Sequence, residues 1–272
     1  MSQSPDAKSP RPEARSGHQP RLQFWYDFAS NYSWIAARRI QVAAREAGVA
    51  LQWKPFLLGP IFAASGWNDS PFNVYPAKGA YAWRDVARLA DGLGLALTRP
   101  QPFPQNSLQA ARLALALPEA ALPAFTVALF AAEFEQGLGL SEAALRQALA
   151  AASANTESPL AAASANMESP LAAANANPEP SLAAASASLG LPLAAASANL
   201  GLPLAAASAS MEPLLAAAGS DAVKRALRAQ TEAAVAAGIF GAPAFIASDG
   251  ELFWGNDRLE QALAWELGLA GR

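Results

Sequence analysis

One short unit near the N-terminus restricts the fold more than any other feature of this sequence. Residues 22–28 (LQFWYDF) are aromatic and partly alternating, which is typical of a strand, and residues 49–58 (VALQWKPFLL) have similar character. Between them, residues 31–47 carry apolar side chains at helical spacing, and Gly48 follows as a helix stop signal. A strand, a helix and a strand within about 35 residues predict a βαβ unit. We therefore expect the two strands to be parallel.

The C-terminal end of the chain predicts two more strands and a final helix. Residues 244–247 (AFIA) and 251–254 (ELFW) have strand composition, and Ser-Asp-Gly between them is a hairpin signal. A helix is predicted from about Asp257 to Leu267. Most of the chain between the two ends predicts helices separated by loops that contain proline and glycine. A thioredoxin-like α/β fold with an inserted helical domain accounts for this order.

The domain boundaries follow from these segments. Residues 1–21 are polar and proline-rich, so we expect them to form a disordered tail. The thioredoxin-like domain is expected to comprise residues 22–59 and 236–272, with the inserted helical domain at residues 60–235. Within the insertion, six consecutive eleven-residue units occupy residues 149–214, and each begins with Leu-Ala-Ala-Ala.

Prolines interrupt these repeated units. Because proline lacks a backbone donor and clashes with the preceding helical turn, each unit is expected to hold at most one or two turns. We interpret the units as a low-complexity insertion without a function of its own. Deletion of residues 150–214 is then expected to leave folding and activity intact, because long surface insertions add little to the cost of loop closure. A small helical solenoid that binds a partner is the alternative.

The composition of the chain excludes several classes of function. The 272 residues carry a net charge of −3 and include no cysteine, so disulfides, thiolate metal sites and cysteine nucleophiles are excluded. The single histidine, His18, lies in the polar tail, which argues against Ser-His-Asp hydrolysis and histidine-built zinc sites. No metal site is expected. The balanced charge and the lack of a signal peptide or a long apolar run predict a cytoplasmic protein without nucleic-acid or membrane partners.

Four residues join the first strand to its helix: Ser30-Asn31-Tyr32-Ser33. A thiol oxidoreductase of the thioredoxin type carries Cys-x-x-Cys at this point, and the helix N-terminus activates the first cysteine. Serines cannot exchange disulfides, but the free N–H groups and the positive end of the helix dipole remain and suit a thiolate that a ligand supplies. An ordinary N-cap is the alternative role for Ser30. Ser33 lies one turn inside the helix and is expected to be structural.

Five segments of the chain resemble a known family, in the family's order. They are residues 24–36 (FWYDFASNYSWIA), 53–59 (WKPFLLG), 76–90 (PAKGAYAWRDVARLA), 102–112 (PFPQNSLQAAR) and 238–259 (GIFGAPAFIASDGELFWGNDRL). The family is the kappa-class glutathione transferase and 2-hydroxychromene-2-carboxylate isomerase family of the DsbA-like thioredoxin superfamily. The eleven-residue units lie outside its pattern, and Asn31 replaces a proline that the family often carries. The resemblance implies glutathione as the cofactor and a homodimer as the assembly.

The resemblance also implies which residues contact glutathione. Ser30 would donate its hydroxyl to the glutathione sulfur, and a cis proline at Pro243 would turn the backbone of Ala242 toward the tripeptide. Asp257 and Arg258 would hold the γ-glutamyl end. The implied cofactor-binding residues are Ala242, Pro243, Asn256, Asp257, Arg258, Lys78 and Asn68, with Asn73 as the alternative to Asn68. A trans turn proline, a plain helix cap and a solvated arginine are the alternatives at Pro243, Asp257 and Arg258.

The implied second substrate is a small aromatic molecule. Trp67 and Tyr81 would form part of an aromatic wall, and Asn106 would supply a polar contact. The implied reaction is glutathione-dependent isomerisation of 2-hydroxychromene-2-carboxylate or a related aromatic carboxylate. In it the cofactor thiolate adds to the substrate, the adduct rotates about the resulting single bond, and glutathione leaves. A glutathione transferase that conjugates small electrophiles and a non-catalytic family member are the alternatives.

Overall fold

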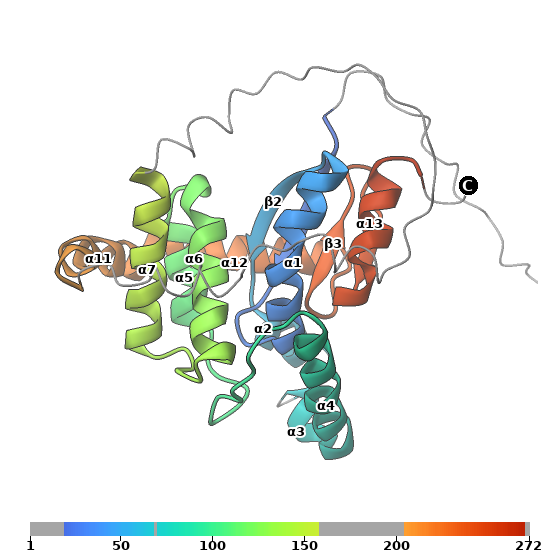
Figure 1. Cartoon of the computed structure of the whole chain (residues 1–272), viewed down its shortest axis with the longest axis horizontal. Coiled ribbons are helices and arrows are strands. Elements are labelled where there is room, and N and C mark those ends of the chain that lie inside the picture. The colour runs from blue at the N-terminus through green and yellow to red at the C-terminus, as the bar shows by residue number, and fades with distance from the viewer. Residues whose placement is uncertain (1–18, 68–69, 158–203, 270–272) are drawn as a thin grey trace, which may run out of the picture.

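The computed structural model describes residues 19–67, 70–157 and 204–269, and its centre is a four-stranded mixed sheet (Figure 1). The strands lie in the order β2-β1-β3-β4. Their bounds are β1 Arg21–Tyr26, β2 Ala50–Pro55, β3 Ala244–Ile246 and β4 Leu252–Trp254. β1 and β2 are parallel, whereas β3 is antiparallel to both β1 and β4. The predicted βαβ unit and the predicted hairpin are therefore confirmed. The predicted tail lies outside the described residues as far as residue 18.

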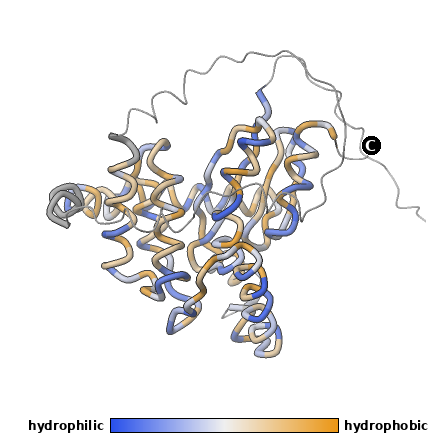
Figure 2. Tube along the Cα trace, viewed as in Figure 1, coloured by the Kyte–Doolittle hydropathy of each residue, from blue (hydrophilic) through white to orange (hydrophobic). Residues whose placement is uncertain are grey.

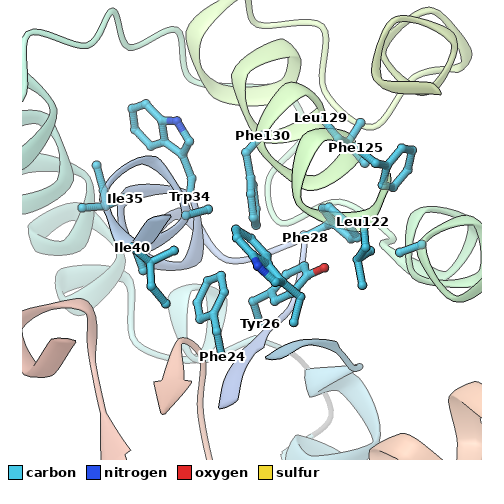
Figure 3. Packing of buried hydrophobic residues seen from close by; sticks show 14 of the residues in the cluster. Phe24, Tyr26, Phe28, Trp34, Ile35, Ile40, Leu122, Phe125, Leu129 and Phe130 are labelled. Carbon is cyan, nitrogen blue, oxygen red and sulfur yellow. The ribbon is translucent and has the colours of Figure 1, made fainter. Parts of the chain in front are cut away.

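Alternation along β1 divides the hydrophobic core into two layers. Leu22, Phe24 and Tyr26 are fully buried on the side of helix α1 (Asn31–Ala47) and helix α13 (Leu259–Glu266). Figure 3 shows Phe24 and Tyr26 between α1 and residues of helix α6 (Leu122–Phe130). Trp25 points the other way, into a second cluster that includes Ala234 of helix α12 (Asp221–Ala236). Successive strand residues face opposite sides of the sheet, so β1 places apolar side chains on both faces. Helices cover each of these two faces.

The helical domain lies beside the sheet and returns to it through α12 (Figure 1). It contains helix α5 (Leu108–Ala116), a short turn η1 (Glu119–Ala121), α6, a π-helical turn η2 (Ala131–Glu135), helix α7 (Glu142–Glu157) and helix α11 (Leu204–Gly219). Hydrophobic residues recur through the packed helices α5, α6 and α7 (Figure 2). α12 ends at Ala236 and therefore spans the domain boundary expected between residues 235 and 236. It also contacts the thioredoxin-like domain, because Thr231 Oγ1 accepts a hydrogen bond from Leu57 N at 3.4 Å.

Three helices between β2 and α5 surround the N-terminal end of α1. They are α2 (Leu58–Ala64), α3 (Pro71–Val74) and α4 (Pro76–Gly92). α4 begins at Pro76, because proline is well suited to the first turn of a helix. After β4, a short turn η3 (Asn256–Arg258) leads into α13.

The first and last repeated units are parts of packed helices. α7 continues through the first unit to Glu157, and Leu149 and Ala152 on it are buried. α11 contains Pro213 in its interior, so the expectation that proline ends each helical stretch is wrong there. α11 packs against α5 and α7, and this tertiary packing offsets the cost of about 3 kcal/mol of an interior proline. The units between them lie within residues 158–203, outside the described part of the chain.

Among the described residues, no helix is long and apolar enough to cross a membrane.

Candidate active site

Ser30 is the N-cap of α1. Its backbone is extended, with φ −104° and ψ 114°, and its Oγ accepts a hydrogen bond from Ser33 N at 3.2 Å. The same Oγ donates to the carbonyl oxygen of Ala242 at 3.0 Å. Because a hydroxyl hydrogen rotates about its Cβ–Oγ bond, Ser30 can redirect this proton to a ligand without losing its role as a cap. The N-cap role and a hydroxyl available to a ligand are therefore compatible in one side chain.

Ala242 and Pro243 face Ser30 from a part of the chain more than 200 residues away. The peptide bond between them is cis, which confirms the expectation for Pro243. Pro243 precedes β3, whose pairing with β1 places Ala244 opposite Trp25. The β1–β3 pairing therefore brings this cis-proline turn to the N-terminus of α1.

A cavity of about 1200 Å³ lies at this end of α1. Its walls come from the loop before α1, from α2, α3 and α4, from residues 104–108, and from residues 240–242 with Trp254. Six of the predicted site residues line it: Ser30, Ala242, Lys78, Asn106, Trp67 and Tyr81. Asn106 Oδ1 also accepts a hydrogen bond at 3.0 Å from the N–H of Leu108, the first residue of α5. The structure therefore gathers residues of five separate segments around Ser30.

The other predicted site residues that the structure describes do not line this cavity. Asp257 and Arg258 are exposed and pair with each other at 3.6 Å, and the Oδ1 of the buried Asn256 has no hydrogen-bond partner among the residues that the structure describes. Pro243 is buried behind Ala242, and Asn73 is exposed on α3. Asn68 lies outside the described residues.

Aromatic side chains form much of the cavity wall. One group comes from the α2–α4 side and includes Phe62 and Trp67, whose ring centroids are 5.6 Å apart. A second group comprises Phe240 and Trp254, 4.8 Å apart and each more than half exposed. Gly241 lies against the Trp254 indole so closely that a Cβ there would collide with Nε1. The sequence analysis missed this second pair, because the side-by-side placement of residues 240 and 254 depends on the pairing of β3 with β4.

Only two of the described residues that line the cavity carry a formal charge, Lys78 and Asp27. Lys78 is exposed, and its Nζ lies 4.8 Å from the ring centroid of Tyr75. Asp27 is 2% exposed, and its carboxylate accepts hydrogen bonds from Leu58 N at 2.7 Å and from Ala29 N at 2.9 Å. Asp27 thus ties the start of α2 to the loop before Ser30, a role that sequence analysis missed.

A second carboxyl, Glu133, is buried on the π-helical turn η2. Neither of its oxygens has a hydrogen-bond partner within the described part of the chain. Burial raises the pKa of Glu133 well above the ordinary value, with the charge of Asp27 adding to the rise. Burial also raises the pKa of Asp27, although hydrogen bonds from Leu58 N, Ser107 and Ala29 N oppose this rise. A buried carboxyl on η2 therefore responds to the charge of Asp27, which lies on the cavity wall.

Known families and solved structures are similar to most of this chain. The profile of the DSBA-like thioredoxin domain family matches residues 21–199 and 196–264, which is most of the chain. Glutathione S-transferase kappa 1 of Caenorhabditis elegans is 33% identical over 85 residues, which make up 31% of this chain. The matched region spans 37% of the length of that relative.

Solved structures of related fold cover nearly the whole chain. A structure of 2-hydroxychromene-2-carboxylate isomerase superposes with a TM-score of 0.58 and 22% identity, covering 89% of this chain and 91% of that one. A probable DsbA oxidoreductase from Streptomyces coelicolor superposes with a TM-score of 0.54 and 15% identity, covering 93% and 92%. At these identities the likeness concerns the fold. The sheet order, the inserted helices and the cis-proline turn are consistent with the family profile. Because that profile matches most of the chain, the chain belongs to the DsbA-like thioredoxin domain family.

Proposed function

We propose that this protein is a glutathione-dependent enzyme in which Ser30 stabilises the thiolate of the bound tripeptide. The observation that carries the proposal is the Ser30 hydroxyl at the N-terminus of α1, on the wall of a large apolar cavity. A helix N-terminus favours an anion. Since the chain has no cysteine, the sulfur must come from a ligand. The partial match to a kappa-class glutathione transferase supports glutathione as that ligand.

In this proposal glutathione lies along the cis-proline turn. The backbone of Ala242 pairs with the tripeptide, Lys78 holds one carboxylate, and Asp257 with Arg258 receives the γ-glutamyl end, with Asn68 as a further contact. The cavity of about 1200 Å³ supports a second ligand beside the tripeptide. Ordinary small-molecule sites occupy about 300–1,000 Å³, so this cavity exceeds the needs of a single ligand.

The first candidate reaction is isomerisation of 2-hydroxychromene-2-carboxylate or a related aromatic carboxylate. The hemiketal ring of the substrate first opens to a phenol and a conjugated ketone. The thiolate then forms a C–S bond to the carbon β to that ketone, and the displaced electron pair moves onto the carbonyl oxygen. The former double bond then rotates, the electron pair returns, and the C–S bond breaks to release the thiolate. No oxidant is consumed, which suits a chain without cysteine. Trp67 and Tyr81 would stack near the substrate rings, with Asn106 as a polar contact.

The charged residues that line the cavity favour a second candidate reaction, the transfer of glutathione to an uncharged aromatic electrophile. Lys78 is the one cation among the described lining residues. If it binds a glutathione carboxylate, a carboxylate on the second substrate would be buried without an opposite charge, which is costly. An uncharged electrophile avoids this cost, and its conjugate would leave with the sulfur still attached.

Two measurements test the proposed function. Calorimetry should show glutathione binding to the full chain, and the absence of binding at millimolar concentrations would refute the proposal. The free thiol concentration during turnover then separates the two reactions. It stays constant if the enzyme isomerises 2-hydroxychromene-2-carboxylate, and it falls by one equivalent per molecule of chlorodinitrobenzene if the enzyme transfers glutathione.

A further inference from the structure

A hydrogen bond joins the motif helix α1 to helix α4 across the side of the cavity. Tyr32 is the third residue of the Ser30–Ser33 segment, and its hydroxyl donates to Asp85 Oδ2 at 2.9 Å. Both side chains are half-buried, and Tyr32 lines the cavity. Burial, followed by the hydrogen bond to Asp85, raises the pKa of the Tyr32 phenol, so the hydroxyl stays protonated and donates at neutral pH. Since the acceptor is a carboxylate, this is one of the stronger kinds of hydrogen bond.

The position of Asp85 on α4 separates two parts of that helix with different surroundings. Val86 and Ala90, in the C-terminal half, are buried in the main core. Lys78 and Tyr81, in the N-terminal half, are exposed and line the cavity. Figure 1 shows α4 together with α3 extending away from the sheet. Ala82 and Trp83, which precede Asp85, are buried as well, and Ala82 also lines the cavity. The Tyr32–Asp85 bond therefore lies about one helical turn C-terminal to the cavity-lining residue Tyr81.

Asp85 also connects to the cavity wall through its own helix. Its Oδ1 pairs with Arg88 at 3.0 Å, and the Arg88 guanidinium lies 5.6 Å from the ring centroid of Tyr81. Polar and cation–π contacts thus run from Tyr32 through Asp85 and Arg88 to Tyr81. These contacts connect α1, whose N-cap is Ser30, to Tyr81 on α4.

We propose that the Tyr32–Asp85 hydrogen bond positions the cavity face of α4 relative to Ser30 and thereby sets the affinity for the second substrate. This inference rests on the proposed glutathione-dependent function. Tyr32 and Asp85 are positioning residues, since neither is assigned a contact with glutathione or with the reacting atoms. Loss of the bond leaves the Ser30 cap and the N-terminus of α1 in place, so thiolate formation should persist while substrate binding weakens.

Kinetic measurements test the inference with variants that change few atoms. Tyr32→Phe removes only the hydroxyl, Asp85→Ala removes the acceptor, and Asp85→Asn restores an acceptor oxygen without the charge. Asp91→Asn is the matched control, because Asp91 is exposed on the same helix and loses the same charge. We expect Tyr32→Phe and Asp85→Ala to raise the KM for chlorodinitrobenzene or 2-hydroxychromene-2-carboxylate about tenfold. The kcat and the pKa of bound glutathione should stay near the wild-type values. Asp85→Asn should recover part of the loss, and the double variant should be no worse than either single variant.

Amide hydrogen exchange supplies a readout that does not depend on activity. In Tyr32→Phe and Asp85→Ala, exchange at residues 76–84 should be faster than in wild type, whereas Asp91→Asn should leave it unchanged. Faster exchange in a protein that fails to bind glutathione would retain the positioning role and refute the proposed function instead. Unchanged exchange at residues 76–84 would overturn the inference. A wild-type KM in an active Tyr32→Phe variant would overturn it as well.

Discussion

Replacement of Ser30 by alanine tests the thiolate site, and the chain offers a matched control for it. The change removes the cap bond from Ser33 N at 3.2 Å and the bond to Ala242 O at 3.0 Å, together with the hydroxyl on the cavity wall. Loss of an N-cap alone costs about 0.5–2 kcal/mol of folding stability. Ser220 caps α12 in the same manner, with its Oγ accepting from Val223 N at 3.3 Å, and it does not line the cavity. Ser220→Ala therefore reports the loss of a cap alone.

The chemical effect of Ser30→Ala should be distinct from the loss of stability. A hydrogen bond to a charged group contributes about 1.5–3 kcal/mol. Because one pKa unit corresponds to about 1.36 kcal/mol, the pKa of the bound glutathione thiol should rise by about 1–2 units in the variant. Removal of a donor to a developing anion typically slows turnover by about 10²-fold, which is the decrease that we expect here.

The assay follows the ultraviolet absorbance of the bound thiolate against pH in wild type, Ser30→Ala and Ser220→Ala. Thermal unfolding of each protein is measured in parallel. Both variants should lose the stability of a cap, Ser30→Ala should lose somewhat more because its bond to Ala242 O is also removed, and only Ser30→Ala should shift the thiol pKa and slow turnover. A near-normal rate in Ser30→Ala, or an unshifted thiol pKa, would refute the assigned role. An equal loss of activity in Ser220→Ala would attribute the effect to folding.

Three further predictions concern the repeats, a buried carboxyl and the aromatic wall. Deletion of residues 160–203, four whole units, removes no described residue and should keep Tm within about 5 °C in a thermal scan. Deletion of residues 150–214 also removes the buried Ala152 and should lower Tm further. Glu133→Gln should stabilise the protein more at pH 8 than at pH 5. Its raised folded pKa means that the folded state retains a proton that the unfolded chain releases above about pH 4.3, so wild-type stability falls as pH rises. If denaturant titrations give the same pH dependence of the free energy of unfolding for wild type and for Glu133→Gln, this reasoning is wrong. Gly241→Ala should displace the Trp254 indole and change tryptophan fluorescence, and an unchanged spectrum would count against the close packing.

Local sequence was sufficient for the elements whose boundaries depend on neighbouring residues. The helix from Asn31 to Ala47 begins at a serine cap and ends at Gly48, whose φ of 68° is the left-handed conformation that glycine adopts readily. The hairpin of β3 and β4 likewise follows from a turn signal between two short apolar runs. Caps, turns and apolar periodicity act over a few residues, so they can be recognised in the sequence without knowledge of the fold.

The candidate site was partly predictable, because family motifs mark residues that the fold later brings together. Ser30, Lys78 and Ala242 were named from separate segments, and all three line one cavity. The sequence alone contained no measure of the distance between them. The pairing of β1 with β3 supplies it, since this pairing sets Ala242 within 3.0 Å of the Ser30 hydroxyl.

Tertiary structure alone decided the features that depend on remote partners. Pro213 lies inside a helix because α5 and α7 pack against that helix, although its local propensity predicts a break. Tyr32 forms a hydrogen bond to Asp85 across 53 residues, and Glu133 is buried with no hydrogen-bond partner among the described residues, although neither residue type predicts such surroundings. Propensity, capping and turn formation are properties of a short segment, so the amino-acid sequence by itself determined those helices and strands whose ends carry such local signals. Burial, pKa shifts and partner choice are properties of surfaces that meet only after folding, so only the packed structure decided them.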